Sequence, residues 1–510
     1  MSHEIDRRTF LQRTSMGAVM TMGLGFLPAS LCAAGKKEDR SSIEASLELL
    51  NVWGEKSKEV NDLYTAMFKV LSQKQDATFA DVAQDATIQT LFQSMGLTHL
   101  GGPLLGCITP DSVKIWIRTT KPAEVDVQID ADGKQQTFGP VRSTLESDLT
   151  AIVPITGLKP GTVTKYTVRI DGKAIAIPGH ANITTPPVAA EAQTRIAFGT
   201  CPHRKGLGNP EQAKQILAFN PHAMVIYGDI AVQDRRNHVG LHRADYALRD
   251  FQTAWKDLAC RVPFYASWDD HDYCNNDGFG INSNFTDADR RQVRKVFAQA
   301  WHNPYYGMGD EGGGIFTHTR VGCCDVIMTD NRYFREKVEK GSTGKKNGFL
   351  GPQQMEWLKK TLLACKGPFI IVTCGTMWDD VAAKGKDSWG IYDPEGREEI
   401  YQFIEKNKIP GVLFLSGDRH GARIFRIPRP AAGHEFYEFE VATLGGLRSI
   451  TAATNPEWKT QLFGQMSMYA HGQFTFDLSG DDPAVTHRLI QSDGQTLFEL
   501  ALKRSQLTPK

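Results

Sequence analysis

The sequence lacks an excess of charge of either sign. Its 510 residues include 58 Lys and Arg residues and 58 Asp and Glu residues, so the formal net charge is zero. Proteins that hold nucleic acid through bulk charge are normally basic, and no specific nucleic acid binding is therefore expected. Any anion that this protein binds must be held by particular side chains or by bound cations.

Cysteine pairs of the kind that bind structural zinc are also absent. None of the nine cysteines lies in a C-x-x-C pair, which excludes zinc ribbons and zinc fingers. Most of the cysteines lie in apolar runs, such as Cys374 in FIIVTCG, and are interpreted as buried free thiols.

The apolar stretch near the N-terminus is too short to span a bilayer. Residues 16–31 contain no charged residue, but a spanning helix needs ~20 apolar residues. Arg7 and Arg8 precede this stretch, and the small residues 32–35 follow it. This order is typical of a cleaved signal peptide, and the arginine pair resembles the twin-arginine (Tat) signal. The sequence therefore predicts export by the Tat machinery, to the periplasm or the medium, with no stable transmembrane anchor.

The rest of the chain changes character twice. Residues 41–95 place apolar residues three and four apart, which predicts a helical segment that packs on a later domain. Residues 100–186 contain short strand-like runs and tight-turn dipeptides, which predict a small antiparallel sandwich. From residue 194 onward, buried strands alternate with helical patterns, which indicates an α/β core.

Side chains that bind metals follow several of these buried strands. They are Cys201, Asp229, Asp269, Asp270, His271, Asp330, Asp418 and His420. Reactive groups of α/β sheets gather at the carboxyl ends of the strands, so we expect these residues to meet. Buried carboxylates cost several kcal/mol each unless a cation neutralises them. Two cations sharing a bridging carboxylate can clamp a phosphoryl group, and Asp229 is the natural bridge.

Six segments occur in the order of a known family. They are GTC (199–201), GDIAVQD (228–234), WDDHDYCNN (268–276), TDNRYFR (329–335), LGPQQMEWL (350–358) and LSGDRHGA (415–422). In these segments the chain resembles the alkaline phosphatase D (PhoD-like) family of calcineurin-like metallophosphoesterases. The resemblance implies an α/β fold: a four-layer α/β/β/α sandwich core, preceded by a small antiparallel β-sandwich like that of fibronectin type III.

The resemblance and the patterns together predict four parts of the chain. They are a signal peptide (1–34), a helical segment (35–99), the small β-sandwich (100–187) and the PhoD-like catalytic domain (188–510).

The resemblance also implies a two-metal centre, with iron and calcium as the expected pair. The implied ligands are Cys201 for iron, Asp229 as the bridge, Asp270 or Asn275 for the second metal, and Asp418 and His420 as the closing ligands. His271 resembles the histidine that meets the phosphate or protonates the leaving group. Arg332 is expected to pair with the substrate phosphate through a bidentate fork, although an ion pair with Asp330 is an alternative.

One position departs from the family pattern. Three residues after Asp229 the family usually has a tyrosine that ligates iron, and this chain has Val232. Either the metal has one protein ligand fewer, or His203 or Asp234 substitutes for the tyrosine.

The sequence thus predicts an enzyme that hydrolyses small phosphate esters with a metal-activated water, with monoesters and diesters both open. The alternative is a non-catalytic protein that binds an envelope component on a degenerate metallophosphoesterase fold. A third reading, in which Cys201 is a covalent nucleophile, requires a nearby base and no metal on the sulfur.

Overall fold

The computed structural model describes residues 42–131, 133–188, 192–336, 348–379, 387–449, 452–455 and 457–510. The predicted signal peptide, residues 1–34, lies outside the described residues. Among the helices of the described part, none combines the length and the apolar character that crossing a membrane demands.

Two β-sheets form the centre of the molecule. The six-stranded sheet has the order β11 (Phe264–Ser267), β10 (Ala223–Tyr227), β9 (Thr194–Gly199), β19 (Ala470–Asp477), β20 (Ala484–Gln491) and β21 (Thr496–Lys503). The seven-stranded sheet has the order β12 (Thr317–Val321), β13 (Cys324–Met328), β14 (Phe369–Thr373), β15 (Val412–Ser416), β17 (His434–Val441), β16 (Gly421–Arg429) and β18 (Gln461–Met466). Strands β9 to β11 are parallel to one another, as are β13, β14, β15 and β17. Their carboxyl ends therefore provide the edges where reactive groups gather.

Alternation along the strands divides the core into layers. Ile196 and Phe198 of β9 pack in one hydrophobic cluster with Val326 and Ile371 of the other sheet, whereas Ala197 packs with the helices. This is the period of two expected of strands that are buried on both faces.

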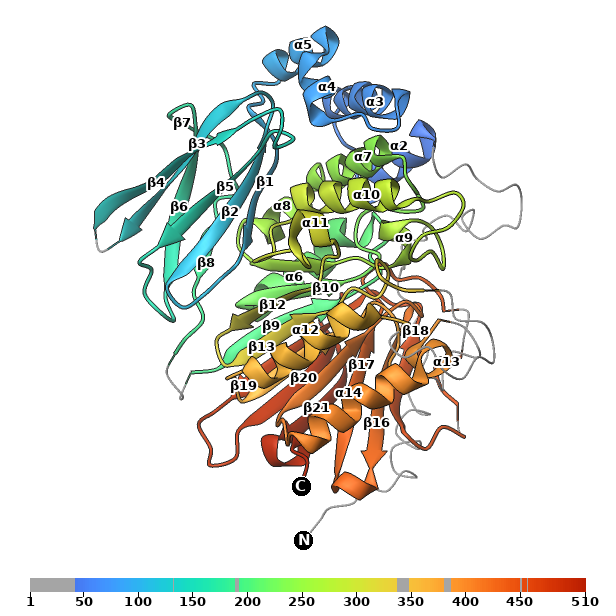
Figure 1. Ribbon diagram of the computed structural model, residues 1–510. Helices are drawn as coiled ribbons and strands as arrows, with labels where there is room; N and C mark the ends of the chain where they lie inside the picture. The colour runs from blue at the N-terminus through green and yellow to red at the C-terminus, as the bar shows by residue number, and fades with distance from the viewer. Residues whose placement is uncertain are drawn as a thin grey trace, which may run out of the picture. The chain divides into compact units, whose positions relative to one another are not determined.

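Helices cover the outer face of each sheet. The six-stranded sheet packs against α6 (Pro210–Phe219), α7 (Val239–Asp250), α8 (Thr253–Ala259) and α10 (Asp287–Ala300). The seven-stranded sheet packs against α12 (Gly351–Ala364) and α14 (Pro394–Lys406), which lie in front of the sheets in Figure 1. The predicted α/β/β/α layering is confirmed.

A small antiparallel β-sandwich precedes the core in the chain (Figure 1). One sheet consists of β1 (His99–Gly106), β2 (Ser112–Thr119) and β5 (Thr150–Thr156). The other consists of β4 (Lys134–Ser143), β3 (Ala123–Ala131), β6 (Val163–Ile170) and β7 (Lys173–Ala174), with β8 (Asn182–Thr184) paired to β6. The Tyr166 hydroxyl donates a hydrogen bond of 2.7 Å to the carbonyl of Cys260, and the Trp116 indole donates one of 3.1 Å to the carbonyl of Gln299. These bonds join the sandwich to the core, and the predicted sandwich is confirmed.

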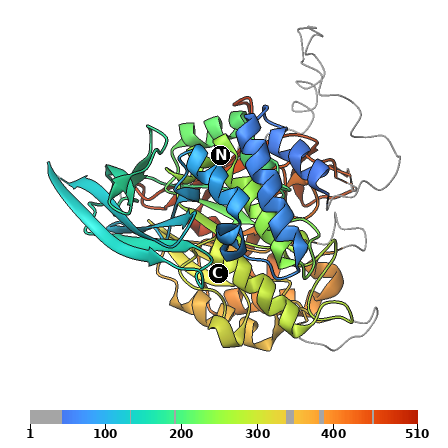
Figure 2. The same ribbon diagram turned by 90° about the horizontal axis from the view of Figure 1, so that it is seen from above.

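Four N-terminal helices share one hydrophobic cluster with α7. They are α2 (Ile43–Asn51), α3 (Lys58–Gln73), α4 (Phe79–Gln84) and α5 (Ala86–Ser94). Leu63 and Met67 of α3 share a buried cluster with Leu241 and Leu248 of α7. Figure 2 shows these blue helices over the green helices of the core. The segment thus buries a helix that carries none of the predicted metal ligands. The domain boundaries themselves stay predictions.

Candidate metal centre

Five of the six predicted ligands follow the carboxyl ends of four strands, four of them in loops and Asp270 as the first residue of the short helix α9 (Asp270–Tyr273). Cys201 follows β9, Asp229 follows β10, Asp270 follows β11, and Asp418 and His420 follow β15. The backbone is left-handed at four of these five residues, with φ values of 58° at Cys201, 52° at Asp229, 71° at Asp418 and 48° at His420. Such strained conformations cluster at functional sites.

The first donor set combines sulfur, nitrogen and oxygen. It consists of Cys201, His203, Asp229 and His420, whose ligand atoms all lie within 4.8 Å of one another. The Cys201 sulfur and the His203 Nε2 each lie 3.6 Å from Oδ2 of Asp229, and the Nε2 atoms of His203 and His420 are 3.0 Å apart. Imidazole and thiolate donors suit a borderline transition metal such as iron or zinc.

The second donor set consists of carboxylates only. Asp229, Asp269, Asp270 and Asp418 also place one oxygen each within 4.8 Å of one another, so Asp229 belongs to both sets. Oxygen donors of this kind suit calcium, magnesium or manganese. Within the described residues, Oδ1 of Asp229, Oδ2 of Asp269 and Oδ1 of Asp270 are buried and accept no hydrogen bond. Buried oxygens without donors are the ones that a cation would satisfy, so the residues present fit a pair of cations.

The electrostatics of the site also indicate cations. Burial, followed by repulsion from Asp270, raises the pKa of Asp229 and of Asp418 well above the usual range of a carboxyl group. Burial raises the pKa of Asp269 to about 6 against the opposing charge of Arg332. Burial and the charge of Asp229 likewise hold the pKa of the Cys201 thiol well above its usual value. A thiol held in this way is a poor free nucleophile, whereas cations would favour the ionised form of every one of these groups.

The PhoD-like phosphatase family model matches residues 229–491, which is more than half of the chain. The chain belongs to the PhoD-like phosphatase family. A second model, that of a domain of unknown function (DUF7800), matches residues 97–188. The PhoD-like family is metal-dependent and consists of phosphoesterase-type hydrolases.

One solved structure shows the same fold. The structure described as "Structure of PhoD" aligns over 81% of this chain and 91% of its own, with a TM-score of 0.60 and 16% sequence identity. The structure of GAP50, described as the anchor in the inner membrane complex of Plasmodium, aligns over 62% of this chain and 89% of its own, with a TM-score of 0.35 and 13% identity. No curated protein sequence matches the chain.

The position of the family tyrosine lies in the core of this family member. Val232 is 1% exposed and packs in the cluster between the six-stranded sheet and its helices. The backbone N–H groups of Ile230, Ala231 and Val232 donate to the Asp272 carboxylate at 2.8, 3.1 and 3.0 Å, which fixes the loop after Asp229. The sequence analysis named His203 and Asp234 as possible replacements for the tyrosine ligand. The structure brings His203 into the first donor set.

Asp234 lies next to His271 instead. Its Oδ1 atom is 2.7 Å from Nδ1 of His271. Burial alone would lower the pKa of His271, but Asp229, Asp270 and the bond to Asp234 together raise it to about 11. A carboxylate on Nδ1 fixes the orientation of the ring. Nε2 then points away from Asp234 and is the nitrogen that can contact another group.

Of the two residues predicted for the second metal, Asp270 joins the carboxylate set. Its Oδ2 atom accepts a hydrogen bond of 2.6 Å from the backbone of Asp277, and its other oxygen stays available. The half-buried Asn275 donates from its side-chain amide to the Asn276 carbonyl at 3.1 Å and accepts from the Cys274 thiol at 3.0 Å. Its role as a metal ligand stays a prediction.

The buried Arg332 is surrounded by carboxylates. Its Nε lies 2.5 Å from Asp269, its Nη1 lies 2.6 Å from Asp387 and its Nη2 lies 3.7 Å from Asp270. Asp330 does not pair with this guanidinium through an ion pair but accepts the backbone N–H of Arg332 at 3.0 Å. The guanidinium therefore neutralises and orients the second donor set. The sequence analysis named Asp330 as its alternative ion-pair partner and did not identify Asp387.

A second arginine beside the centre was not singled out from the sequence. Arg419 lies between Asp418 and His420, is 5% exposed, and places Nη1 3.2 Å from Oδ2 of Asp418. Its Nε and Nη2 atoms are buried and have no hydrogen-bond partner among the described residues. Buried donors without partners are costly unless a ligand satisfies them, so they indicate that Arg419 binds a ligand. Only the structure shows that these donors lack partners, and the sequence does not.

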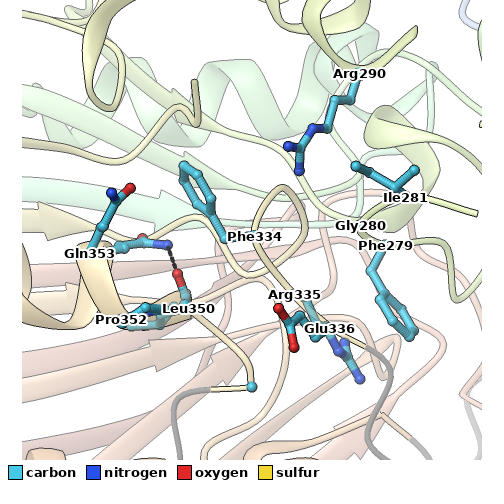
Figure 3. Close-up of a pocket in the computed structure, with 13 residues that line it drawn as sticks. Phe279, Gly280, Ile281, Arg290, Phe334, Arg335, Glu336, Leu350, Pro352 and Gln353 are labelled. Atoms are coloured by element: carbon cyan, nitrogen blue, oxygen red, sulfur yellow. Dashed lines mark hydrogen bonds between the residues drawn. The ribbon is translucent and has the colours of Figure 1, made fainter. Parts of the chain in front are cut away.

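A cavity of about 840 Å³ borders this network. Its lining includes Phe279, Phe334 and Arg335, and Figure 3 shows their side chains around the space. Arg335 shares Asp387 with Arg332, at 2.5 Å and 2.6 Å respectively. The cavity is thus connected to the second donor set through two ion pairs.

Proposed function

We propose that this PhoD-like protein is an exported two-metal hydrolase of small phosphate esters. The observation that carries the proposal is the pair of donor sets that share Asp229. Cys201, His203 and His420 would hold iron with Asp229, while Asp269, Asp270 and Asp418 would hold calcium. When bound, the two cations supply Lewis acidity, which neutralises phosphoryl oxygens and activates a water for attack.

His271 would supply the proton that the leaving oxygen needs. Asp234 holds Nδ1, so the ring keeps one orientation and its Nε2 proton remains for the substrate. The bond to the Asp234 carboxylate, which lies outside both donor sets, raises the pKa of His271 and so favours the protonated ring. A histidine that is oriented and protonated in this way is suited to act as the general acid.

The two arginines would have separate roles. Arg332 faces Asp269, Asp270 and Asp387, and would position the second donor set. Arg419 has two buried donors without partners and lies against Asp418. A guanidinium presents paired donors that match two oxygens of a phosphate, so Arg419 would bind the substrate.

The alternative of a non-catalytic envelope-binding protein loses its supporting feature. That alternative depended on Val232 in place of a tyrosine ligand. His203 restores the number of donors around the first metal, and every other predicted donor of that set is retained. Export through the Tat machinery is proposed on Arg7, Arg8 and the apolar stretch that follows them.

The experiment is a metal analysis combined with two assays. The exported full chain is purified, its metals are measured, and hydrolysis of p-nitrophenyl phosphate and bis-p-nitrophenyl phosphate is followed. We expect bound metal and hydrolysis of at least one substrate. Cys201→Ser should lose the first metal, whereas Cys374→Ser, which changes a buried thiol outside both donor sets, should retain it. A protein without bound metal and without activity after metal addition would contradict the proposal.

A further inference from the structure

A separate group of metal-type donors lies at the other end of the seven-stranded sheet. His318 is on β12, Asp325 is at the start of β13, and Cys365 follows α12 directly. These three elements are neighbours in Figure 1. Asp325 lies near the amino end of β13, whereas the two-metal centre lies at the carboxyl ends of the strands, and the group shares no residue with either donor set. The group is therefore distinct from the two-metal centre.

The three side chains converge on one point. Nε2 of His318 is 2.9 Å from Oδ1 of Asp325 and 4.0 Å from the sulfur of Cys365, and the three ligand atoms all lie within 4.8 Å of one another. A catalytic relay of cysteine, histidine and carboxylate would use two different ring nitrogens, one for each partner. Here the same nitrogen faces both partners, which is the arrangement around a cation. Zinc bonds of about 2.0–2.3 Å in a tetrahedron place neighbouring donors about 3.5 Å apart.

The backbone holds Asp325 in a ligand's orientation. Its Oδ2 atom accepts hydrogen bonds from the N–H groups of Gly367 at 2.6 Å and Lys366 at 3.1 Å, which leaves Oδ1 to face His318. A Cβ at Gly367 would lie 2.8 Å from Oδ2, so only glycine allows this approach. Outer hydrogen bonds of this kind normally orient carboxylates that bind metals.

The group can be reached from solvent. The side chain of His318 is 27% exposed, that of Asp325 is 3% exposed, and Cys365 is half-buried. An ion can therefore enter, and a water can occupy the position that three protein ligands leave open.

We propose that His318, Asp325 and Cys365 bind one zinc ion, with water as the fourth ligand. Imidazole, carboxylate and thiolate are the ligand types that zinc takes in proteins. The ion would link the antiparallel pair of β12 and β13 to the end of α12. This proposal does not depend on the activity of the two-metal centre.

The test uses cobalt as a spectroscopic substitute for zinc. Cys201→Ser is made in every sample, so that the two-metal centre contributes no cysteine–cobalt absorption. We expect the chelator-treated Cys201→Ser protein to develop a thiolate-to-cobalt charge-transfer band. The band should disappear in Cys201→Ser/Cys365→Ser and remain in Cys201→Ser/Cys323→Ser, where Cys323 is a half-buried cysteine outside the group.

Zinc counting provides the second measurement. In the otherwise unchanged chain, His318→Gln and Cys365→Ser should each lower the zinc content of the zinc-saturated protein by about one ion per chain. Phosphate-ester hydrolysis should stay the same, which separates this site from the two-metal centre. Absence of the charge-transfer band in the Cys201→Ser protein, or a zinc count that either variant leaves unchanged, would overturn the proposal.

Discussion

The Nε2 atoms of His203 and His420 lie 3.0 Å apart, although the two residues are 217 positions apart in the sequence. Two imidazole nitrogens at this distance either share a proton or face a common cation. The Asp229 carboxylate, 3.6 Å from the same nitrogen of His203, favours a cation at this point. His203 thus lies where the proposed first metal would need a ligand in place of the family tyrosine.

Replacing His203 should remove the first metal. His203→Ala takes away one of four donors. Loss of a residue that only hydrogen-bonds to a ligand can lower metal affinity about 100-fold, so loss of His203 itself should lower the affinity for iron by more than that. His203→Tyr should restore binding and add a visible phenolate-to-iron absorption band. Elemental analysis and the absorption spectrum measure both effects. His180→Ala, on an exposed histidine, serves as the control, and an unchanged iron content in His203→Ala would show that His203 is not a ligand.

Replacing His271 should affect esters according to their leaving group. His271→Ala removes the proposed general acid, which should lower kcat by about 10²–10⁴-fold for alkyl phosphates. p-Nitrophenolate leaves without much help from an acid, so its ester should lose far less. Equal losses for both kinds of ester would exclude the role.

Asp234→Asn provides a milder test of the same histidine. The carboxylate helps to raise the pKa of His271, so its loss lowers that pKa. Because the acid is active when protonated, the alkaline limb of the kcat profile should move to lower pH, with little change below pH 6. A limb that stays in place would contradict the coupling of Asp234 to His271.

The sequence predicts the layers of the core and the strand ends that carry the ligands. Alternation of side chains along a strand predicts that Asp418 and His420 share one face. The structure brings them to the same centre, one to each donor set, but in the loop after β15 and with left-handed backbone at both residues. The apolar pattern predicts where a buried strand ends, and the polar residue that follows can be read directly from the sequence. Ligands at strand ends are therefore predictable.

The contacts that the sequence did not predict are made by residues in the loops beyond the strand ends. His203 reaches the first donor set because the backbone is left-handed at Cys201 and at His203, with φ values of 58° and 46°. Arg332 meets Asp387, a residue 55 positions later that no motif connects to it. Such contacts depend on how separate loops pack against one another, and neither spacing nor propensity specifies that packing.

Arg419 should contribute to substrate binding without affecting the metals. Arg419→Met removes the two buried donors that have no partner. Hydrogen bonds to charged groups contribute about 1.5–3 kcal/mol, so kcat/KM should fall by about 10- to 150-fold. Inhibition by inorganic phosphate should weaken in parallel, while the metal content stays the same. Arg419→Lys keeps the charge but not the fork and should recover part of the loss. Unchanged phosphate inhibition in Arg419→Met would rule out the contact.

Removal of the metals should make the protein less stable as the pH rises. Burial raises the pKa of Asp269 to about 6, and burial with carboxylate repulsion raises those of Asp229 and Asp418 well above their usual range. A carboxyl group whose pKa is raised on folding stabilises the native state below its unfolded pKa near 4. That contribution is lost as the pH rises through the folded pKa, on the order of 3 kcal/mol for Asp269.

His271 acts in the same direction at higher pH. Its pKa is raised to about 11, so its contribution is present below about pH 6.5 and is lost as the pH rises towards 11. The melting temperature of chelator-treated protein should therefore be higher at pH 5 than at pH 8. Metal-loaded protein should show a smaller difference, because the cations offset the repulsion that the carboxylates otherwise exert. Asp418→Asn should reduce the pH dependence of the metal-free protein, since it removes one of the crowded carboxylates. A metal-free protein that becomes more stable between pH 5 and pH 8 would mean that these carboxylates are already compensated without cations.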